Sequence, residues 1–278
     1  MLLSSTAIHL LLALLLPFIA GADTVVQGTR PSPGQVLAFR ALRVSHGERA
    51  RTLSALPASE REVFFRTLSV ADLVAIGRKS LASLGVYQAR VTREERVGGR
   101  VHGPDAVEIT VRESPRAVRL EFVAGKHKGR LALYSEELRP REMLARESGI
   151  LGIVSMWLAV DSHLAQRDTN HTITEVGFGA MIDTMHAEQA KVAAAGGFGR
   201  EDEGFDARGL YCILFTAPPG VQGLYAMRLR YCVDSGLVLP MKIEVFDGQG
   251  RREYVEFENL RARQTLGADF FTPRGAGL

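Results

Sequence analysis

Residues 107–122, VEITVRESPRAVRLEF, decide the fold class of this chain. Apolar residues alternate with polar or charged ones on both sides of Ser114-Pro115. A period of two is typical of strands with one buried and one solvated face, and Ser-Pro favours a turn. The stretch therefore predicts two antiparallel strands with a shared apolar face.

Strands of the same kind are expected on either side. Residues 87–91 alternate in the same way before the turn at Gly98-Gly99, and 131–133 follow Gly129. Four strands with short connections predict an antiparallel meander. Eight apolar side chains are expected on its concave face: Val107, Ile109, Val111, Val118, Leu120, Phe122, Leu131 and Leu133.

Helices are predicted before this meander and in mid-chain. Periodicity favours helices over 35–44, 59–68 and 70–84, the last capped by Ser69 and ended by Gly85. A further helix is expected over 174–195.

Two segments are interpreted less directly. Residues 150–158 fit either a buried strand or a short helix. Residues 196–209 (GGFGREDEGFDARG) are expected to form a flexible acidic loop.

The two cysteines predict a disulfide across a hairpin. If Cys212 lies opposite Cys232, the apolar faces of both strands match, and the turn is centred in the Pro/Gly-rich residues 218–223. A one-residue slip would spoil this match and a two-residue slip would not. A last hairpin is expected with Val245 opposite Glu253. Together these patterns predict an α+β fold: a curved antiparallel sheet of eight or more strands with a few helices.

The first 22 residues predict a cleaved export signal. Residues 10–20 (LLLALLLPFIA) are about half as long as a membrane-spanning helix, and small residues precede the expected cleavage after Ala22. The alternative is an uncleaved anchor, because no Lys or Arg precedes the apolar run. The expected organisation is a signal peptide (1–22), a linker with short helices (23–68) and the β domain (69–278), in a periplasmic or secreted protein.

Composition excludes few functions. The 278 residues include 34 basic and 31 acidic side chains, a net charge of +3 that does not indicate nucleic-acid binding. A pI near 9.0 is compatible with peripheral contact with an anionic membrane. The sequence does not define an oligomeric state.

Three segments resemble one bacterial family. The central Asn170-His171-Thr172-Ile173-Thr174-Glu175-Val176-Gly177, the charged Glu94-Glu95-Arg96 and the ending Leu266-Gly267-Ala268-Asp269-Phe270-Phe271-Thr272-Pro273 are similar to domain of unknown function 1571. The ending is also similar to the LolA-like superfamily of periplasmic lipoprotein carriers and lipid-binding proteins. One departure is Thr172, where the family usually has Pro. The resemblance implies an incomplete β-barrel with an apolar lumen suited to acyl chains, and it implies no activity.

No catalytic residue, cofactor or metal site is predicted. Asp161, His163, Asp168, His171 and Glu175 are the densest set of ligand-type residues, but their spacing does not supply three clear zinc ligands. Thr172 and Glu175 instead fit a helix capping box, with His171 orienting the loop before it. The cluster Lys126-His127-Lys128 is interpreted as a solvated turn.

Three functions remain open at this point. The first is a non-enzymatic periplasmic protein that binds or carries the acyl chain of a lipid or lipoprotein in a cavity lined by the eight concave-face residues. The second is an envelope interaction protein whose lumen is filled by its own side chains. The third is a hydrolase that uses His163 or His171.

Overall fold

The helices at the start of the described chain are short and joined by tight turns. The structure, a computed structural model, describes residues 45–149, 154–262 and 265–278, all within one compact unit. The expected signal peptide and the helix expected over 35–44 lie outside these residues. The helices are α2 (His46–Ala55), α3 (Ala58–Thr67) and α4 (Val70–Leu84). No helix in the described ranges is long and apolar enough to span a membrane.

The α4 helix follows its sequence signals closely. The Ser69 hydroxyl accepts the backbone N–H of Asp72, while the Asp72 carboxylate accepts the N–H of Ser69, and this capping box satisfies two otherwise free donors. Gly85, with a φ of 63°, ends the helix. The buried side of α4, including Leu73 and Ile76, contributes to the main apolar core.

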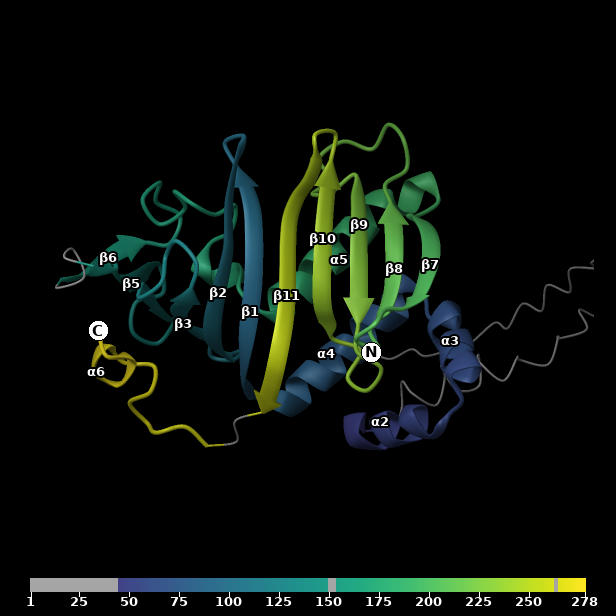
Figure 1. The fold of residues 1–278 in the computed structure, drawn as a ribbon, viewed down its shortest axis with the longest axis horizontal. Helices are drawn as coiled ribbons and strands as arrows, with labels where there is room; N and C mark the ends of the chain where they lie inside the picture. Colours follow the sequence, from purple (N-terminus) through teal and green to yellow (C-terminus); the bar gives the residue numbers. More distant parts are fainter. Residues whose placement is uncertain (1–44, 150–153, 263–264) are drawn as a thin grey trace, which may run out of the picture. The chain divides into compact units, whose positions relative to one another are not determined.

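Within the described residues, eleven strands form a single antiparallel sheet (Figure 1). Their bounds are β1 (Val86–Val97), β2 (Arg100–Arg112), β3 (Ala117–Ala124), β4 (Leu131–Ser135), β5 (Glu142–Arg146), β6 (Ser155–Ala159), β7 (Gly199–Phe205), β8 (Tyr211–Thr216), β9 (Arg228–Val233), β10 (Pro240–Asp247) and β11 (Gly250–Ala262). The spatial order is β6-β5-β4-β3-β2-β1-β11-β10-β9-β8-β7. This open curved sheet with a few helices confirms the predicted α+β class.

Two meanders make up the sheet. The first runs outward from β1 to β6, and the second returns from β7 to β11, where β11 pairs with β1. Between the meanders the chain forms the 3₁₀ turn η2 (Ile173–Glu175), the helix α5 (Phe178–Val192) and the turn η3 (Ala193–Ala195). The helix expected over 174–195 is therefore interrupted at Gly177, whose φ is 107°.

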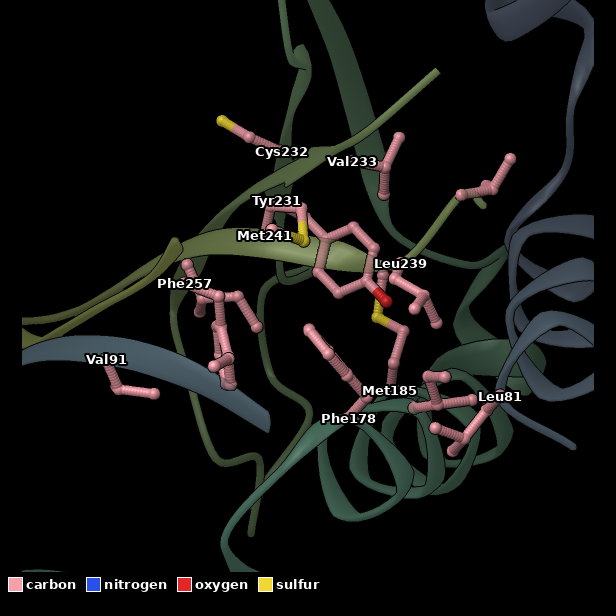
Figure 2. Packing of buried hydrophobic residues seen from close by; sticks show 14 of the residues in the cluster. Leu81, Val91, Phe178, Met185, Tyr231, Cys232, Val233, Leu239, Met241 and Phe257 are labelled. Atoms are coloured by element: carbon pink, nitrogen blue, oxygen red, sulfur yellow. The ribbon is translucent and has the colours of Figure 1, made fainter. Parts of the chain in front are cut away.

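The α4 and α5 helices cover one face of the sheet, behind β1, β11 and β10 in Figure 1. Figure 2 shows Phe178 and Met185 of α5 among residues of the sheet such as Tyr231 and Phe257. The rings of Phe178 and Phe257 are 4.4 Å apart. Because both residues are at most 2% exposed, this contact joins α5 to the middle of the sheet.

The predicted disulfide is confirmed. Cys212 of β8 and Cys232 of β9 are directly opposite and bonded, with Ile213 opposite Tyr231 and Phe215 opposite Leu229. Matching the apolar faces therefore gives the observed register. The register of β10 and β11 also places Val245 opposite Glu253, as expected.

The prediction that Leu131 and Leu133 of β4 lie on the concave face was wrong. Leu131 and Leu133 are paired with Glu121 and Arg119, so they lie on the opposite face from Leu120. Leu133 packs in a second apolar cluster under the C-terminal segment, with Phe271, which precedes α6 (Pro273–Ala276), and Ala276, the last residue of that helix. This segment covers the face that the sequence pattern left to solvent.

The structure also decides the form of two segments, 196–209 and 150–158. Residues 199–205, expected within a loop, form the edge strand β7. Arg200 fixes this strand to α3 by donating to the backbone carbonyls of Phe65 and Leu68. In the ambiguous segment, Ser155–Ala159 is a strand, and 150–153 lie outside the described residues.

Candidate functional site: an apolar cavity with a polar end

A cavity of about 330 Å³ lies between α5, the sheet and the loop 160–172. Apolar side chains from both meanders and from α5 form most of its wall. They include Val91, Leu120, Phe122, Ala132, Met143, Met181, Met185, Phe215, Leu229, Ile243, Val245, Val255 and Phe257. The volume is at the lower end of the usual range for small-molecule sites, roughly 300–1,000 Å³.

Only part of the predicted lining contributes to this wall. Leu120 and Phe122 line the cavity. The other β2 and β3 residues of the predicted set lie on the same face of the sheet but are packed into the core: Val107, Ile109, Val111 and Val118. Leu131 and Leu133 are on the other face and do not line it.

The cavity reaches the surface beside two exposed apolar residues. Leu164 in the loop 160–172 is 49% exposed, and Met227 just before β9 is 59% exposed, and both line the cavity. The segment 196–209, expected as a flexible loop, contributes only Phe198 to the wall. The loop before η2 and the segment before β9 therefore border the entrance.

One end of the cavity is polar. On β1 and β11 the cavity-facing residues change from apolar to charged: Val91 is opposite Phe257, and Glu95 is opposite Glu253. The two carboxylates are 4% and 3% exposed. Buried acids need partners, because leaving a charge unpaired in a nonpolar interior is costly.

The loop before η2 supplies these partners. Thr169 donates its hydroxyl to Glu95 at 3.0–3.1 Å, and the Asn170 backbone N–H donates to the same carboxylate at 2.7 Å. Asn170 Nδ2 also donates to Glu253 Oε1 at 3.2 Å. The loop is therefore bound to both buried acids of the sheet.

His171 completes the polar end. Its Nε2 lies 3.0 Å from Glu253 Oε2 and 2.8 Å from the Tyr225 hydroxyl, which itself donates to Glu253. Burial lowers the pKa of His171, but the hydrogen bond to Glu253 and the surrounding carboxylates outweigh it, so this pKa is raised. Burial raises the pKa of Glu253, but the hydrogen bond and charge of His171 reverse this, so the pKa is lowered. At neutral pH the carboxylate form of Glu253 is therefore favoured.

The predicted cap is found next to His171. The Glu175 carboxylate accepts the backbone N–H of Thr172 at 2.7 Å and the Thr172 hydroxyl at 3.0 Å. The motif caps the short turn η2 and not a long helix, because α5 begins only at Phe178. His171 Nδ1 lies 3.9 Å from Glu175, in addition to its contacts inside the cavity.

A second charged cluster holds the same loop. Asp168 lies 3.2 Å from His127 Nε2 and 3.6 Å from Arg130, and His127 Nδ1 is 2.8 Å from Asp105. Burial raises the pKa of Asp168, but the positive charges of His127, Arg167 and Arg130 outweigh it, so this pKa is lowered. His127 is 5% exposed, so its interpretation as part of a solvated turn was wrong.

The sequence did contain a signal for the polar end. Arg93 and Glu95 continue the cavity-facing alternation of β1, and Glu253 does the same on β11. When one face of a strand is covered, charged residues at the positions that point to that face indicate a buried polar site. His163, by contrast, is exposed and contributes nothing to the cavity.

The family model of proteins of unknown function, DUF1571, matches residues 85–275, more than half of the chain. The chain belongs to the DUF1571 family. The match begins at Gly85 and includes both meanders, α5 and the loop that holds His171. No curated protein sequence matches this DUF1571 chain.

Several solved structures are similar to this DUF1571 protein. An uncharacterized conserved protein from Thermus thermophilus is 12% identical, with 73% of this chain and 93% of that chain covered and a TM-score of 0.44. Lipoprotein LppX of Mycobacterium tuberculosis is 12% identical over 72% of this chain and 100% of that one, at a TM-score of 0.40. A LolA superfamily protein of Nitrosomonas europaea is 11% identical over 74% and 98%, at 0.32.

Proposed function

We propose that this protein is a non-enzymatic binding or carrier protein that holds the acyl chain of a lipid or lipoprotein in the cavity between α5 and the sheet. The observation that carries the proposal is the apolar wall of a 330 Å³ cavity that reaches the surface beside Leu164 and Met227. A folded protein rarely keeps such a space lined by side chains that could have closed it.

The energetics of burial favour an acyl guest. Each methylene transferred from water into an apolar site contributes about 0.8 kcal/mol. Met143, Met181 and Met185 line the wall, and the unbranched methionine side chain adapts its shape to a flexible guest. Acyl chains of different lengths can therefore be bound by the same wall.

The compartment is consistent with this function. The Cys212–Cys232 disulfide is typical of a protein outside the cytoplasm. We propose that the protein acts in the periplasm or outside the cell, directed there by a signal that is removed by cleavage after Ala22. Leu164 and Met227 at the entrance would contact the acyl chain, or the surface of the membrane that donates it, during transfer.

Native mass spectrometry tests this proposal. Protein purified from the envelope without detergent should carry adducts of acyl-lipid mass, which solvent extraction removes. The extracted protein should then bind a fluorescent fatty acid. Protein that carries no lipid adduct and also fails to bind the fatty acid would contradict the proposal. It would favour an interaction protein whose lumen is filled by its own side chains.

A further inference from the structure

Two buried carboxylates lie directly opposite each other at the polar end of the cavity. Glu95 of β1 and Glu253 of β11 form a cross-strand pair, and each is at most 4% exposed. Like charges in this position destabilise a sheet, and burial strengthens the repulsion. The arrangement is stable only with positive charge beside it.

Arginines supply part of this charge. Arg93 Nη1 lies 3.0 Å from Glu95 Oε1, and Arg252 Nε lies 3.5 Å from Glu253 Oε1. The Oε2 atom of Glu253 instead contacts the His171 ring. Together with the hydrogen bonds from Thr169, Asn170 and Tyr225, these contacts use both oxygens of each acid, so a bound ion would replace some of them.

His171 brings a nitrogen ligand to the two acids. One ligand atom from each of Glu95, His171 and Glu253 lies within 4.8 Å of the others. The three residues come from β1, the loop before η2 and β11, so the fold, and not local sequence, assembles them. A metal ion bound at 2.0–2.2 Å in tetrahedral geometry would separate its ligands by roughly 3.3–3.6 Å. Small side-chain shifts therefore suffice to close the set around an ion.

We propose that Glu95, His171 and Glu253 bind a divalent transition-metal ion, with an open coordination position toward the cavity. One imidazole and two carboxylates suit Zn²⁺ and its first-row neighbours, whereas Ca²⁺ and Mg²⁺ prefer oxygen ligands alone. Three protein ligands with a free position are typical of zinc sites that bind a further group. The proposal does not depend on an acyl guest.

The surroundings orient the three ligands. Thr169 and the Asn170 N–H hold Glu95, while Asn170 Nδ2 holds Glu253 Oε1. Glu175 Oε2 lies 3.9 Å from His171 Nδ1, the nitrogen that would remain free when Nε2 binds metal. A carboxylate behind a ligating histidine is common in metal sites and strengthens binding.

Calorimetric titration of the tag-free, chelator-treated full chain with ZnCl₂ tests the site. We expect saturable binding and a rise in the melting temperature with Zn²⁺ concentration. Glu253→Gln and His171→Ala should each weaken Kd by more than about 100-fold, and Glu175→Gln, which only removes the charge behind the ring, by about 10-fold. Absorption of bound Co²⁺ should report the loss of His171 as a spectral change.

Matched controls separate this site from binding elsewhere. His186→Ala on the exposed side of α5 and Glu258→Gln on the exposed side of β11 should leave Kd unchanged. Glu253→Gln keeps the shape of the side chain. A circular dichroism spectrum identical to that of the parent would show that this variant is folded, so that a change in Kd reports the loss of a ligand. Absence of saturable Zn²⁺ binding, or binding unchanged in both Glu253→Gln and His171→Ala, would overturn the proposal and leave a hydrogen-bonded network without metal.

Discussion

The apolar wall and the polar loop of the cavity are held by different interactions. At the wall, Phe178 of α5 packs on Phe257 of β11 in a fully buried contact. The loop 160–172 is held by charge and hydrogen bonds, through Asp168 to His127 and through Asn170 to Glu95. Apolar contacts are independent of pH, whereas ionic contacts depend on it. We therefore expect the loop to open before the wall does.

Phe257→Ala should have the largest effect on stability. Removing a buried aromatic ring costs about 3–5 kcal/mol, because it loses burial and leaves a cavity. Urea denaturation of the parent and the variant measures this directly. Val101→Ala, at a position 62% exposed, should change the free energy of unfolding by less than about 0.5 kcal/mol. A loss below about 1 kcal/mol for Phe257→Ala would contradict a wall held by this packing.

Asp168→Asn should lower stability by about 1–3 kcal/mol by weakening the charged contacts of the loop. Because the pKa of Asp168 is lowered in the folded protein, its contribution is complete above the unfolded value near 3.9 and is lost as pH falls through the folded value. The difference between parent and variant should therefore shrink below about pH 4. His127, His102, Arg130 and Arg167 face this carboxylate.

Hydrogen exchange localises the same effect. Amides of the loop 160–172 should exchange faster in Asp168→Asn, while those of α5 should not. Asp161→Asn, an exposed acid of the same loop, is the matched control and should change neither. Equal acceleration in α5 would mean that loop and wall open together.

Glu175 should show the smallest effect. Glu175→Ala removes the acceptor for the Thr172 N–H and should cost about 1 kcal/mol, whereas Glu175→Gln keeps an acceptor oxygen and should cost little. Thermal unfolding of the two variants checks this. A Gln variant as unstable as the Ala variant would show that the charge of Glu175, and not its hydrogen bond, stabilises the loop.

Local signals in the sequence predicted several elements well. Ser69 and Gly85 bound α4 because caps act within one turn, and the Cys212–Cys232 register followed from two alternating strands beside one turn. The edge strand β7 was missed because GREDEGF lacks the β-branched and aromatic residues typical of strands, apart from its final Phe205.

Contacts between distant segments could not be predicted in this way. All residues of β4 are buried, so alternation does not tell which side Leu133 faces, and its cover is the C-terminal segment. Likewise, Glu95 and Glu253 meet only because the first and last strands pair. Nothing near either residue in sequence indicates that pairing.

The most direct test of the central claim compares two alanines of α5. Ala180 lines the cavity and Ala187 is exposed. Ala180→Phe should fill part of the cavity and weaken fatty-acid probe binding by at least about 10-fold, corresponding to about 1.4 kcal/mol, whereas Ala187→Phe should leave the affinity unchanged. Equal affinity in both variants, with both folded, would contradict an acyl-binding cavity between α5 and the sheet.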